Sequence, residues 1–341
     1  MLILVVFILL IFLFLLPFLP GIAELVRKQD TDPLFISMSY VKDPRYFGKS
    51  FRRLIRHASE GLSAGPEIHD VLLSKKEKLQ VVELGNIPDG AEINYLLYVK
   101  GNLSSGDRVR LIKEVYVTGD TSIGSNNVIR ALAVDGNVRV GEGSQFERWL
   151  DASGAIDISK GCNLGISMSS SRTLCLAPNC QFRRLYGQPI VTSNNTITRR
   201  AVLERSVPRA LLLPRQQSFI RRNEGVIEAH SIINSNTVFS QDVQIGCGSI
   251  LRADIKSYGK LVLEEDVRVD GNVFADGDIL IGRGANIKGH IFSQGAVHIC
   301  EQTVTSYPGA VKSIIAKKSI RIEQNVTIYG YVVTEGDGRI L

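Results

Sequence analysis

The sequence predicts an all-β protein whose body is a β-solenoid in two blocks, with a small triangular cross-section and about 18 residues per turn, preceded by a single transmembrane helix. Three observations predict this fold: a repeat that recurs in two stretches, a composition rich in glycine and poor in aromatic residues, and an apolar N-terminal run. The 31 glycines, single tryptophan and 7% aromatic content suit tight corners around an interior too narrow for large rings.

The N-terminal run, residues 1–23, is uncharged and close to the roughly 20 residues that a membrane-spanning helix needs. We expect Leu2, Leu16 and Phe18 to belong to this anchor. A cleaved signal peptide is the alternative, but it would carry basic residues ahead of its apolar core, whereas the first basic residue here is Arg27. Basic residues follow the run, so the positive-inside rule predicts a single-pass protein with a cytoplasmic body.

Residues 24–78 form a basic juxtamembrane region that contains one amphipathic helix. Apolar residues recur there at helical spacing, at Phe47, Phe51, Leu54 and Ile55. The opposite side carries the basic residues predicted to meet the membrane surface, Lys49, Arg52, Arg53 and Arg56. Such a helix binds anionic lipid through its basic residues or caps the open end of the solenoid with its apolar face, and both interpretations stand.

The repeat defines a first block at 79–185 and a second block at 237–341. In the row that starts at Val273, the apolar or small residues are Val273, Ala275, Ile279, Ile281, Ala285 and Ile287. This alternation predicts three short strands per turn, with glycine, asparagine and aspartate at the corners between them. A single turn cannot bury its apolar face alone, so we expect the turns to stack through backbone hydrogen bonds.

Between the blocks, residues 186–236 break the period and are interpreted as a linker or a lateral insertion. The segment is rich in arginine but lacks interleaved aromatic residues, so we expect no binding of nucleic acid. One continuous column and two columns side by side both fit the repeat.

Motifs for chemistry are scarce. His298 is the one candidate for the general base of a hexapeptide-type acyltransferase, although an ordinary surface histidine is the simpler interpretation. Cys162 and Cys180 occupy the same position in consecutive rows and should stack, as two reduced thiols in preference to a disulfide. No phosphate-binding loop, zinc-ligand spacing or serine-nucleophile motif is found. The sequence therefore predicts a protein that is not an enzyme, with no catalytic residue, cofactor or metal.

Two segments, VDGNVRVGEGSQF from Val134 and ADGDILIGRGANIKGHIF from Ala275, resemble the repeating turn of the bactofilins. Bactofilins are polymer-forming cytoskeletal proteins of bacteria. The resemblance implies a nucleotide-free filament that assembles end to end at the inner membrane and scaffolds cell-envelope enzymes. The chain departs from the family pattern by its two solenoid blocks and its N-terminal transmembrane helix.

The first functional hypothesis is a membrane-anchored scaffold that self-associates through its solenoid, with inner-membrane lipid and envelope-assembly or secretion proteins as further partners. An unpaired end strand is a template for another chain, which gives polymerisation a physical cause. The expected interface residues are Tyr95, Leu97, Ile328, Tyr329, Tyr331 and Val332. The alternatives are a non-catalytic accessory subunit of a membrane complex, in polysaccharide export or surface-appendage assembly, and a hexapeptide-type acyltransferase.

Overall fold

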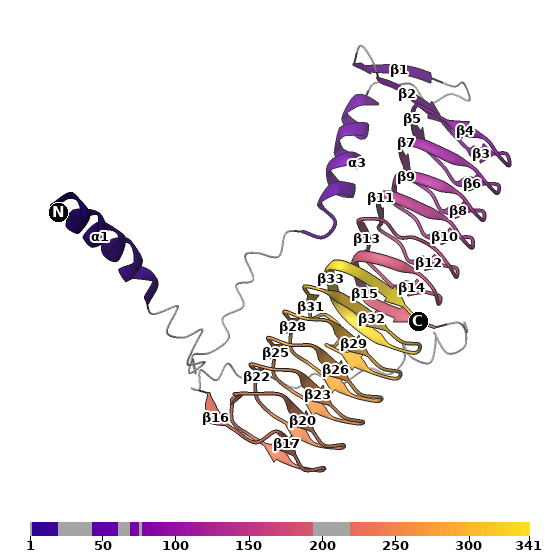
Figure 1. Ribbon diagram of the computed structural model, residues 1–341. Coiled ribbons are helices and arrows are strands. Elements are labelled where there is room, and N and C mark those ends of the chain that lie inside the picture. The colour runs from indigo at the N-terminus through magenta and orange to yellow at the C-terminus, as the bar shows by residue number, and fades with distance from the viewer. Residues whose placement is uncertain (1, 20–42, 61–68, 75–76, 194–218) are drawn as a thin grey trace.

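The computed structural model describes residues 2–19, 43–60, 69–74, 77–193 and 219–341 (Figure 1). Its helical elements are α1 (Leu2–Leu15), the 3₁₀ turn η1 (Leu16–Phe18) and α3 (Tyr46–Ala58). Within these described ranges, no helix has both the length and the apolar character needed to cross a membrane. Of the predicted anchor residues, Leu2 lies in α1, and Leu16 and Phe18 lie in η1 with exposed side chains. Most of the predicted segment between the anchor and α3 lies outside the described residues.

The first block begins after a short strand, β1 (His69–Ser74), that pairs with β2 in antiparallel fashion. Its strands are β2 (Glu77–Val82), β3 (Gly85–Ile87), β4 (Glu92–Ile93), β5 (Leu96–Val99), β6 (Leu103–Ser105), β7 (Arg110–Val117), β8 (Thr121–Ile123), β9 (Val128–Val134), β10 (Val138–Val140), β11 (Gln145–Ala152), β12 (Ile156–Ile158), β13 (Ser167–Ser170), β14 (Leu174–Leu176) and β15 (Gln181–Thr192).

The second block has the same plan with shorter strands. They are β16 (Ile220–Arg222), β17 (Val226–Ile227), β18 (Ile232–Ile233), β19 (Thr237–Phe239), β20 (Val243–Ile245), β21 (Ile250–Leu251), β22 (Ile255–Ser257), β23 (Leu261–Leu263), β24 (Arg268–Val269), β25 (Val273–Ala275), β26 (Ile279–Ile281), β27 (Asn286–Ile287), β28 (Ile291–Ser293), β29 (Val297–Ile299), β30 (Val304–Thr305), β31 (Lys312–Ala316), β32 (Ser319–Ile322) and β33 (Thr327–Ile340).

The predicted β-solenoid is confirmed, with about 13 turns of about 18 residues each. Within each block, the strands of successive turns pair in parallel, as β10 does with β12, where Val138 lies beside Ile156. In these strands the central residue points outward and its neighbours point into the core, so Arg139 is exposed between buried Val138 and Val140. The period-two pattern of the sequence is therefore the inward and outward alternation of the strands.

One corner of each turn adopts a left-handed backbone conformation. In the first block it falls on Asn126 (φ 56°), Gly143 (φ 66°), Gly161 (φ 71°) and Asn179 (φ 61°), and the second block continues the series with residues such as Gly248 and Gly284. Glycine and asparagine tolerate positive φ better than other residues. This corner explains why these two residue types recur at one position of the repeat.

The two blocks form a single column, stacked end to end (Figure 1). The chain leaves the first block after β15 and starts the second block at its far end, so that β33 returns to lie against β15. Buried apolar residues of both blocks belong to one continuous core, which includes Leu185 and Ile190 on one side of the junction and Ile328 and Val332 on the other.

The blocks extend further than the sequence boundaries at 185 and 237. Strand β15 runs on to Thr192, and β16, β17 and β18 make an additional turn before Thr237. The repeat is hard to see in that turn because charged Arg222 takes the place that Phe239 holds one turn later. Residues 194–218 of the predicted linker lie outside the described residues.

Candidate functional site

The junction between the blocks, formed by β15 and β33, is an antiparallel pairing of the two last turns. Tyr186 lies opposite Tyr331, and Gly187 lies opposite Gly330. Antiparallel strands are related by a local twofold axis, so the two solenoids meet C-terminal end to C-terminal end. Elsewhere in the column, neighbouring turns are parallel.

Hydrogen bonds at the corners extend this junction beyond its central strands. The Asn179 N–H donates to the Ile340 carbonyl over 2.8 Å, and the Ile340 N–H donates to the Cys180 carbonyl over 2.9 Å. At the opposite corner the Thr192 hydroxyl donates to the Glu323 carbonyl over 2.6 Å. The contact therefore spans the whole cross-section of the column.

The predicted C-terminal polymer surface lies inside this junction. Ile328, Tyr329 and Val332 are buried, and Tyr331 is half-buried opposite Tyr186. The expectation that this turn presents a free end must be corrected, because β15 of the same chain already occupies its edge.

The predicted N-terminal surface lies one turn inside the column. Leu97 is buried in β5, which has β2 on one side and β7 on the other, and Tyr95 is half-buried against the core. Strand β2 adds an outer turn, and β1 covers the edge of β2. The predicted first block, which begins at residue 79, includes this turn, but the expected end surface lies one turn later, at Tyr95 and Leu97.

The first turn of the second block is the other outer end of the column. Within the described part of the chain, β16, β17 and β18 each pair on one side, with β19, β20 and β21. Three apolar side chains are largely exposed on this turn: Ile220 at 52%, Val226 at 64% and Ile232 at 58%. Unpaired backbone and exposed apolar side chains thus occur together at this end.

Helix α3 lies along a side of the first block, against β7, β9 and β11, and does not cover an open end (Figure 1). Ile55 is fully buried against outward-facing residues of the solenoid, and Phe51 meets Trp149 edge to face with 5.7 Å between ring centroids. The approach is close enough that a Cβ on Gly48 would lie 2.3 Å from the Cβ of Asp151. Glycine is therefore required at this contact.

Arg52 is the centre of a charged cluster under the helix, although it is only 7% exposed. Its Nε donates to Asp135 over 2.8 Å, and its Nη1 donates to Asp151. Nη2 donates to the carbonyls of Val134 over 2.6 Å and Asp151 over 2.8 Å. A buried guanidinium is tolerated when its donors are satisfied in this way.

Two further arginines of this region contact the same carboxylates. Arg45 binds Asp151 with two donors, over 2.7 and 2.9 Å. Arg56 donates to Asp135 over 2.7 Å and to the Tyr116 hydroxyl over 2.8 Å. Burial and the hydrogen bond to Asp135 raise the pKa of Tyr116, so its hydroxyl stays protonated.

The four basic residues predicted to meet lipid thus differ in what they contact. Arg52 and Arg56 bind the solenoid, Arg53 is exposed, and Lys49 pairs with Asp43 over 2.6 Å at the surface. The outer side of α3 also exposes apolar side chains, at Tyr46, Phe47 and Leu54.

His298 lies on the outer surface of the second block, 34% exposed, with its Nε2 2.9 Å from the Glu323 carboxylate. Burial and the nearby Glu323 carboxylate raise the pKa of neighbouring Cys300 to about 11, which makes the thiol a poor nucleophile. Cys162 and Cys180 are both buried and free, as the sequence predicts. The pKa of Cys180 is raised by its contact with the Cys162 thiol and by burial.

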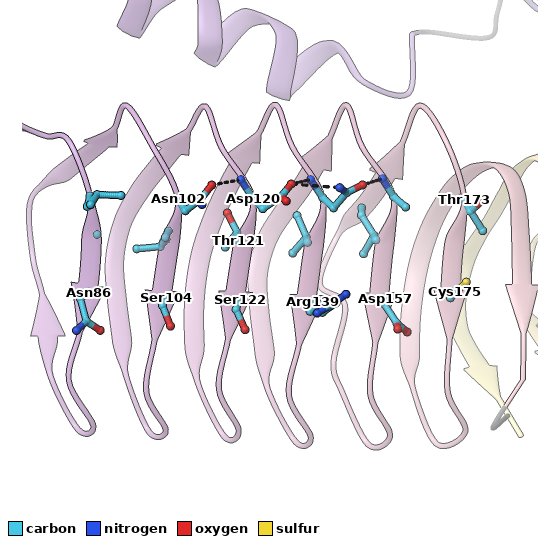
Figure 2. Close-up of a pocket in the computed structure, with 17 residues that line it drawn as sticks. Asn86, Asn102, Ser104, Asp120, Thr121, Ser122, Arg139, Asp157, Thr173 and Cys175 are labelled. Atoms are coloured by element: carbon cyan, nitrogen blue, oxygen red, sulfur yellow. Dashed lines mark hydrogen bonds between the residues drawn. The ribbon is translucent and has the colours of Figure 1, made fainter. Parts of the chain in front are cut away.

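A shallow groove of about 870 Å³ runs along one face of the first block (Figure 2). Along its edge, asparagine and aspartate side chains bridge successive turns: the Asn102 side chain accepts from the Asp120 N–H over 2.8 Å, and Asp120 accepts from the Asn137 N–H over 2.7 Å. These side chains are engaged in holding the turns together, which gives the groove a structural role.

The fold and these surfaces define the class of protein, a two-block β-solenoid closed by an internal end-to-end junction. No family model, curated protein or solved structure matches the chain.

Proposed function

We propose that this protein is a non-catalytic scaffold that is held at a membrane by its N-terminal segment and associates end to end with copies of itself. The observation that carries the proposal is the outer turn of the second block, where the unpaired edges of β16, β17 and β18 lie beside exposed Ile220, Val226 and Ile232. A strand edge of this kind favours addition of another strand.

A second copy of the same end is the expected partner. In the junction between β15 and β33, two turns of this solenoid pair in antiparallel fashion, which supports the same kind of contact between copies. An interface between identical ends is self-complementary and closes with twofold symmetry. At the other end of the column, β3 and β4 pair with β6 and β7 and offer outer edges of their own. Contacts at both ends would produce a filament.

Attachment to the membrane is the second part of the proposal. Helix α1 exposes large apolar side chains around its circumference, among them Leu9, Phe12, Leu13 and Phe14. A surface so apolar requires a cover of lipid or protein. The apolar and basic side chains on the outer side of α3 would face the same membrane, with Arg53 as the basic contact.

The test is the assembly state of the detergent-purified full chain, measured by mass photometry and negative-stain electron microscopy across protein concentration. We expect particles that lengthen with concentration. The double variant Val226→Glu and Ile232→Glu should form dimers and nothing longer, because only the outer turn of the first block can still bind another copy. Ile166→Glu, which places the same charge on an exposed apolar residue at the side of the column, is the matched control.

Two results would contradict the proposal. A wild-type chain that stays monomeric at every concentration would exclude autonomous assembly and favour an accessory subunit of a membrane complex. Equal lengthening of the wild type and the double variant would show that the outer turn of the second block is not the contact.

A further inference from the structure

Three side chains with different metal-binding atoms converge on the surface of the second block. The ligand atoms of His298, Cys300 and Glu323 all lie within 4.8 Å of one another, and each residue is partly exposed. His298 Nε2 lies 2.9 Å from a Glu323 carboxylate oxygen. The other oxygen of Glu323 accepts the Glu301 N–H over 3.0 Å, which fixes the orientation of the carboxylate.

The solenoid register brings these residues together. His298 and Cys300 are two residues apart along β29 and its extension, so both point away from the core, whereas Ile299 between them is buried. Ile322 of β32 lies beside Ile299, which places Glu323 next to Cys300 on the adjacent turn. The cluster is therefore invisible to a search for short motifs, because Glu323 belongs to the following turn.

We propose that His298, Cys300 and Glu323 bind a divalent transition-metal ion of the zinc class. Imidazole, thiolate and carboxylate are the three ligand types that zinc takes in proteins, and a water molecule would complete a tetrahedral set. Tetrahedral ligands at zinc bond lengths lie about 3.4–3.6 Å apart, so rotations of exposed side chains are enough to form the site. On binding, the Cys300 thiol would release its proton to solvent, and the resulting thiolate and the Glu323 carboxylate would supply two negative charges to the divalent ion.

Binding would connect two neighbouring turns beside the junction of the blocks. The backbone carbonyl of Glu323 accepts the Thr192 hydroxyl over 2.6 Å, so the same residue takes part in the site and in the junction. An ion that binds the folded chain and not the unfolded one raises the free energy of unfolding, by an amount that grows with the logarithm of the ion concentration above its dissociation constant. We therefore expect the metal to stabilise the last turns of the second block, next to the junction.

The experiment is a titration of the metal-free full chain with Co²⁺, followed by competition with Zn²⁺. We expect one ion per chain, an intense visible spectrum typical of tetrahedral cobalt and a thiolate-to-cobalt charge-transfer band. Cys300→Ser should abolish the charge-transfer band. His298→Ala and Glu323→Gln should each weaken metal binding by roughly 10–100-fold or more, because removing even a hydrogen-bond partner of a ligand costs that much and these changes remove a ligand itself.

Cys247→Ser is the matched control, because Cys247 is also a partly exposed free thiol of the second block. It should leave the spectrum and the affinity unchanged. The proposal is overturned if the wild type shows no charge-transfer band, or if Cys300→Ser keeps the band. Circular dichroism of each variant separates loss of a ligand from loss of the fold.

Discussion

Replacing Arg52 with alanine tests whether α3 is held to the solenoid by its buried charges. The change removes the hydrogen bonds to Asp135 and Asp151 and leaves the Asp151 side chain, which is 1% exposed, with fewer partners. Breaking a buried ion pair costs about 3–5 kcal/mol. Because Arg45 and Ser169 still bind Asp151, we expect the lower value, about 3 kcal/mol, and thus a rise of about a hundredfold in the undocked fraction of α3.

Hydrogen exchange of the α3 amides in the full chain measures this equilibrium. A helix of 13 residues is marginal in isolation, so undocking should expose its amides to exchange. Arg53→Ala is the matched control, since it removes the same charge from the next, exposed position of the same helix. We expect protection to fall about a hundredfold in Arg52→Ala and to change less than about twofold in Arg53→Ala. Similar protection in the two variants would refute the reasoning.

Three further predictions concern the column itself. Gly338→Ala would place a Cβ 2.4 Å from the Phe182 ring at the junction and should lower stability by about 1–3 kcal/mol in denaturant titrations, whereas Gly225→Ala, where the nearest atom is 3.5 Å away, should not. His290 accepts the Ser313 N–H through Nδ1, and burial, then the charge of Lys312, lowers its pKa from 6.5 to about 4. At pH values between about 4 and 6.5, the unfolded chain therefore carries a proton on His290 that the folded chain lacks, so the free energy of unfolding should fall as the pH drops from 6.5 to 4. His290→Asn, which keeps a hydrogen-bond acceptor, should flatten this pH dependence. In hydrogen exchange, β16 to β18 should open before β15 and β33, and the reverse order would contradict the nearest-neighbour account of stability.

The sequence predicts the solenoid well because each turn repeats the same physical requirements. Val273, Ile279 and Ile287 mark inward positions, and all three are buried as the alternation predicts. Gly248 and Gly284 mark a corner with positive φ. A local pattern of this kind needs no knowledge of distant contacts, which is why the repeat and its corners can be found by inspection.

The junction and the docking of α3 could not be predicted in this way. Val332 belongs to the turn expected to contact another copy, and nothing local indicates that this turn pairs instead with Leu185 of the same chain in antiparallel fashion. Arg52 and Asp151 are 99 residues apart, and a basic amphipathic helix reads equally well as a lipid-binding helix. The burial of Arg52 and Ile55 on the helix, and of Asp151 beneath it, shows that α3 docks on the solenoid with this face and does not present it to lipid.

The internal junction determines what kind of assembly the chain can build. Each block runs from an outer N-terminal turn to the shared contact between β15 and β33, so both ends of the column are N-terminal turns. A parallel head-to-tail contact would need a free C-terminal turn, and the edges of both such turns are already paired within the chain. In the proposed assembly, copies therefore add through outer turns, in antiparallel contacts like the one inside the chain. Where each contact joins two identical ends, as proposed above, the filament has twofold axes along its length, so its two ends are equivalent and it has no overall direction.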